Sequence, residues 1–265
     1  MLLNEDCIRQ QLKELKVQPS VGLHILSTID STNRYLKDIS WTYPLELCCA
    51  EEQTQGRGRF QRAWSSPNKG NLYCSLGLSI PQSISNVSAL SLIVGIAIKQ
   101  SLEQMDIKAD IRLKWPNDLL WQGKKLCGVL IESISFQKEL RIIIGIGLNV
   151  NIDPKEKKAM NLPNNSWCSL YEMTGQIFDR NRLLALLLRQ INNDINQFTQ
   201  HGLQPFLDRW QKWDYLQGKK IIVTQSNECI QGMAQGINAF GQLIVIDDTQ
   251  KIHYIASGEA SIQSA

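Results

Sequence analysis

The stretch from Ile142 to Asn151, IIIGIGLNVN, restricts the fold more than any other part of the sequence. It is apolar almost throughout, and it belongs to a strand predicted over Glu139–Val150, which pairs with the strand expected over Leu126–Ile134 across a short polar turn. Gly145 and Gly147 leave space where side chains should be. Such glycines mark a groove in which a ligand or another backbone lies against the sheet, or else a β-bulge or close packing against a helix.

Periodicity and turn residues predict the remaining elements. Helices are expected up to about Lys16 and up to Asp38, then over Ala89–Met105, from Ser169, over Arg182–Thr199 and over Gln204–Trp213. Further strands are expected over Val21–Ile29, Leu45–Glu51, Asn71–Ile80 and Ile111–Lys114. The last fifty or so residues are short β-rich runs separated by Gly, Asn and Asp, which predicts a small β-barrel or sandwich.

The composition excludes several classes of protein. The 265 residues, 43% of them hydrophobic, are sufficient for a large domain with a small one attached. With 28 basic and 25 acidic residues the net charge is +3, too weak to favour nucleic acid or an anionic membrane as the main partner. The densest apolar run, Ala89–Ile98, has ten residues where a spanning helix needs about 20, so it predicts a buried helix. No secretory signal opens the chain, and we expect a cytoplasmic protein.

The seven cysteines are an odd number without a CxxC pair, and the three histidines are far apart in sequence. This distribution favours reduced thiols and argues against disulfides and zinc.

A long loop over Gln53–Gly70 has almost no aliphatic residues, and loops of this length are usually functional or disordered. We expect Gly56 and Gly58 to adopt positive φ angles and to approach a ligand closely. Three arginines within six positions offer forked donors for phosphate or carboxylate oxygens; they are Arg57, Arg59 and Arg62. The loop therefore predicts a site for a small anion. A solvated basic loop or an RNA patch is the alternative.

The segment KWPND places Lys114 at the end of a short strand, before a rigid Trp-Pro step. A lysine in this position can direct one compact charge at a bound oxyanion, although most lysines are simply solvated. Asn149 and Asn151 lie at the end of the glycine-bearing strand, where they offer amide groups at the mouth of the groove.

Several blocks in order resemble the biotin protein ligases. They are Asp30-Ser31-Thr32-Asn33, the GRGR loop with Arg62, Trp64 and Ser66-Pro67, Leu72-Tyr73, KWPNDLL, KKLCGVLIE and GIGLNVN. The resemblance extends over nearly the whole chain. It implies an α+β fold, with a class II synthetase-like catalytic domain over residues 1–216, in which helices pack on a mixed central sheet. It also implies an SH3-like β domain over residues 217–265.

The resemblance implies ATP-dependent activation of biotin to biotinyl-5′-AMP, with Mg²⁺ accompanying ATP. Biotin is then transferred to a lysine of a biotin carboxyl carrier protein, a subunit of acetyl-CoA carboxylase. The implied biotin contacts are Ser31, Thr32, Asn33, Gln53, Arg57, Gly58, Arg59, Lys114, Gly145 and Gly147. The implied ATP or adenylate contacts are Arg59, Arg62, Trp64, Lys114, Asn117, Asn149 and Trp167. Arg59 and Lys114 are the expected catalytic residues, and no metal ligand is assigned.

The same resemblance implies that the polar segment over Ile152–Ser166 orders over adenine. Two departures from the family pattern matter. The chain begins at the helix that would follow a DNA-binding winged helix, so we expect no binding of nucleic acid. Near the C-terminus, Ser261-Ile262-Gln263 stand where some relatives have an arginine, which leaves Glu259 as the polar group of that region.

Two other functions remain open: a lipoate protein ligase with the same adenylate chemistry, and a biotin-sensing module without turnover. The GRGR loop and KWPND follow the biotin pattern rather than the lipoate one, and intact Arg59 and Lys114 argue against a module without turnover. The mobile arginine loop and exposed strand edges are compatible with a homodimer.

Overall fold

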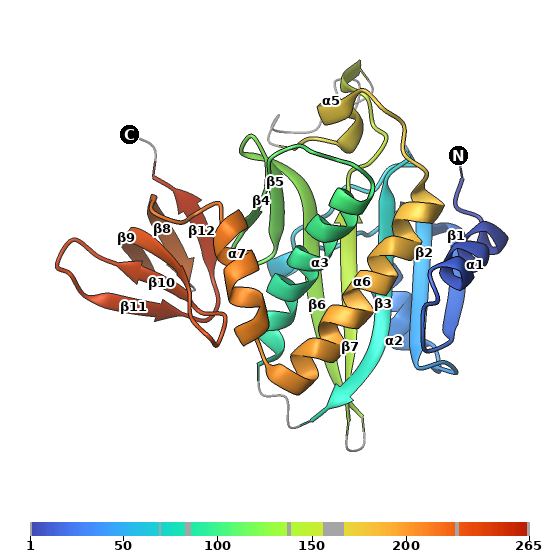
Figure 1. Cartoon of the computed structure of the whole chain (residues 1–265), viewed down its shortest axis with the longest axis horizontal. Helices are drawn as coiled ribbons and strands as arrows, with labels where there is room; N and C mark the ends of the chain where they lie inside the picture. The colour runs from blue at the N-terminus through green and yellow to red at the C-terminus, as the bar shows by residue number, and fades with distance from the viewer. Residues whose placement is uncertain are drawn as a thin grey trace.

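The computed structural model describes residues 2–68, 70–82, 86–136, 139–155, 167–225 and 228–263. Its main part is a seven-stranded sheet in the order β1-β2-β3-β7-β6-β5-β4, in which β1 and β2 are parallel and the other neighbours antiparallel (Figure 1). The strands are β1 Val21–Ile29, β2 Leu45–Gln53, β3 Leu72–Pro81, β4 Ile111–Lys114, β5 Asp118–Trp121, β6 Lys124–Phe136 and β7 Glu139–Leu148. The predicted mixed sheet is therefore confirmed.

Helices cover both faces of this sheet. On one face, α3 (Leu90–Gln104) packs against α6 (Arg180–His201), and α1 (Glu5–Glu14) packs against α6 (Figure 1). On the other face, α2 (Thr32–Asp38) lies over β2, β3 and β7, where Leu36, Cys48 and Ile143 form a second apolar cluster. Shorter helical segments are η1 Arg59–Gln61, η2 Val87–Ala89, α5 Leu170–Thr174, η3 Gln204–Phe206 and α7 Leu207–Trp213.

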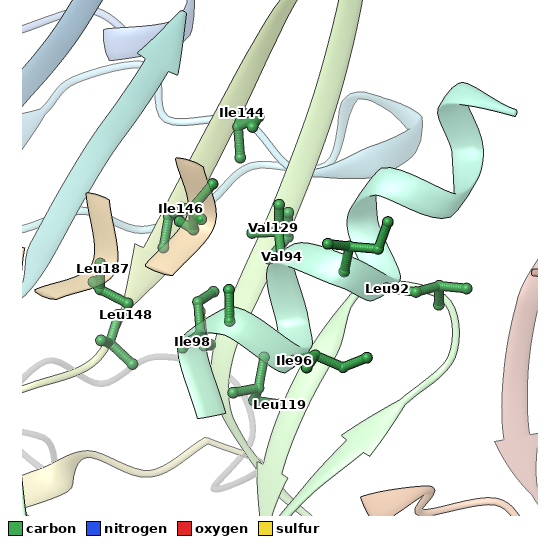
Figure 2. Close-up of a cluster of buried hydrophobic side chains, with 14 of the residues drawn as sticks. Leu92, Val94, Ile96, Ile98, Leu119, Val129, Ile144, Ile146, Leu148 and Leu187 are labelled. Carbon is green, nitrogen blue, oxygen red and sulfur yellow. The ribbon is translucent and has the colours of Figure 1, made fainter. Parts of the chain in front are cut away.

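The apolar run expected to form a buried helix lies in α3, at the centre of the core. Its side chains share one buried cluster with side chains of β5, β6, β7 and α6 (Figure 2), and the labelled members are Leu92, Val94, Ile96, Ile98, Leu119, Val129, Ile144, Ile146, Leu148 and Leu187. The helix is apolar on nearly all sides because the sheet lies against one flank and α6 against another. Within the described part of the chain, no helix is both long and apolar enough to cross a membrane.

The C-terminal strands form a separate antiparallel sheet of five strands in the order β11-β10-β9-β8-β12, as expected for the SH3-like β unit (Figure 1). They are β8 Lys220–Gln225, β9 Glu228–Ile237, β10 Leu243–Ile246, β11 Ile252–Ile255 and β12 Glu259–Ile262. The domain boundary predicted at residues 216–217 falls in the connection between α7 and β8 and stays a prediction.

Strand β5 has no counterpart among the predicted elements. It is four residues long, DLLW, and it directly follows the Trp-Pro turn. Its strand character comes from pairing, because Lys114 of β4 is opposite Asp118 and β6 lies on its other side. A run this short has no periodicity of its own to detect.

Candidate active site

A cavity of about 480 Å³ lies where the 53–70 loop, the central strands and β12 meet. Many of the residues singled out in the sequence line it, although they come from four separate segments. They are Ser31, Thr32, Asn33, Gln53, Arg57, Gly58, Arg59, Arg62, Trp64, Lys114, Asn117, Gly145 and Gly147. The tertiary fold therefore joins the glycine-bearing strand, the arginine loop and the strand-end lysine in one place.

The two strand glycines accommodate side chains from distant segments. A Cβ atom at Gly145 would lie 2.4 Å from Asn33 Oδ1, and one at Gly147 would lie 2.4 Å from Trp64 Cε2. Gly128, opposite Gly147 in the register of β6 and β7, would also contact the Trp64 ring at 3.0 Å. The glycines thus allow an amide and an indole to approach the sheet closely, and both of these groups line the cavity.

The arginine loop folds back on itself. Isolated bridges pair Gln53 with Ser66 and Arg57 with Ala63, and Trp64 N donates to Gly56 O at 2.9 Å. The expected positive φ angles at Gly56 and Gly58 are wrong, since they occur instead at Phe60 and Gln61.

Position 56 requires glycine because the site has no space for a side chain, and not because the backbone there needs a positive φ angle. A Cβ atom there would lie 2.4 Å from Trp64 O.

Buried polar groups form one wall of the cavity. Thr32 N donates to Gln53 Oε1 at 2.9 Å, and Gln53 Nε2 donates to Ser66 Oγ at 3.0 Å. The Ser75 hydroxyl lies 2.7 Å from Thr32 Oγ1 and 2.5 Å from Asn33 Oδ1. A connected set of hydrogen bonds of this kind holds each amide and hydroxyl in one orientation.

Cationic groups form the opposite end. Burial has the largest effect on the pKa of Lys114 and of Arg59, and it lowers each pKa below its ordinary value. The nearby carboxylates Asp118 and Glu259 act in the opposite direction but do not cancel this effect. Arg59 Nη1 donates to Gly258 O at 3.1 Å, and Arg62 forms an ion pair with Glu259 Oε2 at 2.5 Å. A bound anion would stabilise both partly desolvated cations.

The structure adds residues that the sequence reasoning missed. Asp118 and Lys125 line the cavity and form an ion pair at 2.7 Å, and Lys125 Nζ lies 5.2 Å from the centre of the Trp64 ring. Asp118 lies in KWPND and Lys125 in KKLCG, two of the blocks that resemble the family, so their membership of these blocks could have indicated a place at the site. Cys74 and Thr224 also line the cavity, and nothing in their sequence context indicated it.

Two predicted adenylate contacts are not among the lining residues. Asn149 is buried, and its Oδ1 accepts a hydrogen bond from Asn71 Nδ2 at 3.3 Å. Trp167 makes a parallel bridge with Lys125. The segment expected to order over adenine lies outside the described residues over 156–166, so the roles of Asn149, Trp167 and this segment stay predictions.

An enzyme that joins two anions must overcome the charge repulsion between them. Partly desolvated cationic side chains beside a narrow cleft do this, because they neutralise the anions where they meet. The mixed sheet, the cleft and its cationic end together define a ligase that activates a carboxylate.

Comparison with known proteins gives the family. Residues 25–149 match the Biotin/lipoate A/B protein ligase family, and residues 217–262 match the Biotin protein ligase C terminal domain. The bifunctional ligase/repressor BirA of Escherichia coli strain K12 is 36% identical over 243 residues, which cover 91% of this chain and 74% of that protein. The chain belongs to the biotin protein ligase family.

Two further relatives agree with this assignment. The biotin--[acetyl-CoA-carboxylase] ligase of Mycobacterium tuberculosis is 29% identical over 73% of this chain and 70% of its own length. The solved structure of the biotin protein ligase from Aquifex aeolicus in complex with biotin and ATP is 30% identical, with a TM-score of 0.76 over 92% of this chain and 99% of that chain.

Proposed function

We propose that this protein activates biotin with ATP to biotinyl-5′-AMP and pyrophosphate, and then transfers biotin to one lysine of a biotin carboxyl carrier protein. The observation that carries the proposal is the cavity itself, which combines a wall of amides and hydroxyls with the partly buried cations Lys114 and Arg59. The polar wall suits a urea ring, and the cations suit a carboxylate that meets a phosphate.

In the first step, a biotin carboxylate oxygen forms a bond to the α-phosphorus of ATP while the bond to the leaving pyrophosphate breaks. Lys114 would pair with the carboxylate and then with the acyl phosphate, and Arg59 and Arg62 would neutralise phosphate oxygens. The work of these residues is positioning and electrostatic stabilisation. Trp64 supports this placement, because its buried indole Nε1 has no hydrogen-bond partner among the described residues and can donate to a ligand oxygen.

In the second step, the amine of the carrier lysine attacks the acyl carbonyl, and AMP leaves with the electrons of the broken C–O bond. The cations that held the phosphate then stabilise the leaving AMP. Until the carrier arrives, the mixed anhydride must be kept from water. The contacts of Arg59 and Arg62 with Gly258 and Glu259 support such protection, since they close the loop against β12.

Mg²⁺ accompanies ATP in this proposal. No group of three or more His, Cys, Asp or Glu suited to a metal occurs among the described residues. In the proposal the ion is bound mainly by nucleotide phosphates, because Mg²⁺ often takes one or two carboxylates and completes its shell with phosphates and water. Asp118 and Glu259 are the lining carboxylates that would be available to hold it, and the ion would neutralise charge on the departing pyrophosphate.

The test is pyrophosphate release by the purified protein with ATP and Mg²⁺, with biotin and with lipoate as alternative acids. We expect release with biotin and labelling of a purified carrier domain that is lost when its acceptor lysine is replaced by arginine. Release with lipoate alone would favour the lipoate ligase, and binding of biotin without release would favour a sensing module.

We further propose that the protein works in the cytoplasm, without nucleic acid as a partner, and that it forms a homodimer. Strand β1 is one edge of the main sheet, and an edge strand leaves backbone groups available for pairing. Light scattering with and without biotin and ATP tests the dimer.

A further inference from the structure

Glu132 lies behind the polar wall and does not line the cavity. Its Oε2 accepts a hydrogen bond from Asn33 Nδ2 at 2.7 Å, and its Oε1 pairs with the ammonium of Lys37 on α2. Asn33 is 6% exposed and lies over Gly145, where a Cβ atom would be 2.4 Å from its Oδ1. Glu132, on β6, thus holds the side chain of Asn33, which is a predicted biotin contact.

The carboxylate of Glu132 decides which way the Asn33 amide faces. An ionised carboxylate only accepts hydrogen bonds, so the amide nitrogen must point to Glu132 and the oxygen to Ser75. Ser75 is fully buried and lies opposite Gly145 in the register of β3 and β7. Its single proton must therefore go to Asn33 Oδ1, at 2.5 Å.

This choice propagates one step further. Ser75 Oγ, having given its proton to Asn33, can only accept from Thr32 Oγ1 at 2.7 Å. Thr32 Oγ1 then donates toward Ser75 Oγ, with Gln53 Oε1 at 3.1 Å as a second acceptor for the same hydroxyl, and Thr32 N also donates to Gln53 Oε1. Asn33 and Thr32 both line the cavity, so the second N–H of Asn33 and a lone pair of Thr32 remain for a ligand, and a urea group needs one donor and one acceptor of this kind.

We propose that Glu132 is a positioning residue that sets the direction of the Asn33–Ser75–Thr32 hydrogen bonds and so the affinity of the site for a urea ring. The proposal rests on biotin being the acid that enters this cavity. Glu132 does not touch the substrate, and its effect passes through the orientation of Asn33. A site with fixed donors and acceptors discriminates strongly between ligands, because a protein amide turned the other way leaves a buried polar atom of the ligand or the site unpaired.

The variant Glu132→Gln reverses this direction for a specific reason. The introduced amide turns its oxygen to the Lys37 ammonium and its NH₂ group to Asn33, which forces Asn33 to turn its oxygen that way. Adding Lys37→Met removes this preference, so that the introduced amide can again accept from Asn33. If residue 132 had only a structural role, removing its second partner Lys37 would not restore biotin binding to Glu132→Gln. Asp38→Asn, an exposed charge on the same helix, is the matched control.

Calorimetric titration with biotin, combined with KM values for biotin and ATP from pyrophosphate release, tests the proposal. We expect Glu132→Gln to weaken biotin binding at least about tenfold, roughly 1.4 kcal/mol, with KM for ATP changed less than about twofold. The double variant should recover part of this loss, and Asp38→Asn should match the wild type. Unchanged biotin affinity, an equal loss for ATP, or no recovery in the double variant would overturn it.

The calorimetric result is independent of turnover. If the wild type binds biotin and releases no pyrophosphate, the proposed ligase reaction fails while the comparison of dissociation constants still decides the role of Glu132. If the wild type does not bind biotin, both proposals are overturned.

Discussion

Gly147 of β7 lies directly under the indole of Trp64, at a distance that no other residue could tolerate. A Cβ atom at position 147 would be 2.4 Å from Trp64 Cε2 and 2.6 Å from its Nε1. The glycine of a buried strand and the tryptophan of the arginine loop are 83 positions apart in the sequence, yet each fixes where the other can be. The arginines of the loop reach the cavity because this contact holds the loop on the sheet.

Gly147→Ala should therefore push Trp64 off the sheet and disturb the arginine loop with it. We expect a loss of about 1–3 kcal/mol of stability, typical of overpacking, and a larger relative loss of biotin and ATP binding. Thermal unfolding and ligand titration measure the two effects. Gly95→Ala is the control, since its nearest contact would be 3.6 Å and alanine favours a helix. Normal ligand binding by Gly147→Ala would contradict this account of the loop.

Arg59→Gly should release the activated intermediate. Arg59 is half-buried at the cationic end of the cavity, and without it the adenylate loses a partner that would retain it. We expect free biotinyl-5′-AMP in solution and biotin on lysines of unrelated proteins in a mixture, detected by blotting. Lys108→Gly, an exposed cation that does not line the cavity, is the control. Target selectivity equal to that of the wild type would show that Arg59 has another role.

Lys114 should give the reaction an alkaline limit. Burial, its largest effect, lowers the pKa of Lys114 below the ordinary 10.5, so the ammonium loses its proton at a lower pH than a solvated lysine. Biotin affinity should fall as the pH rises through that lowered pKa, and Lys114→Arg should move the limit to higher pH. Profiles of kcat/KM against pH for the two proteins measure this.

The same pKa has a consequence for stability. A lysine whose pKa is lowered on folding destabilises the folded state while it is protonated, and this cost disappears above pH 10.5. Lys114→Met should therefore raise the melting temperature at neutral pH while abolishing activation of biotin. A lower melting temperature would mean that the charge attraction between Lys114 and Asp118 outweighs the cost of burying the ammonium.

Arg180 and Glu51 form a buried ion pair that anchors α6 to the sheet. Arg180 Nη1 donates to Glu51 Oε2 at 2.8 Å, and its Nη2 donates to Glu51 Oε1 at 3.0 Å. Removing one partner leaves the other charge buried and unpaired, so Arg180→Met should lower the free energy of unfolding by about 3–5 kcal/mol. The double variant with Glu51→Leu should be more stable than Arg180→Met alone, as measured by urea unfolding. A double variant that is no more stable than Arg180→Met would contradict this.

Local sequence patterns predicted most of the helices and strands, with β5 as an exception, and the chemical types of most residues at the site. Continuous apolar runs predicted α3 and β7, since burial requires such runs whatever the topology, and the ordered blocks predicted the family. Cations, amides and strand glycines could each be named in advance, because their residue types limit what they can bind.

How these groups meet depends on contacts that form only in the folded chain. Strand β5 exists through pairing with β4 and β6, and Gly56 is glycine because the backbone of Trp64 passes close by. The orientation of Asn33 depends on Glu132, 99 positions away. Such relations arise from contacts between distant segments, and a local pattern of residues contains no information about which distant side chain will supply the partner.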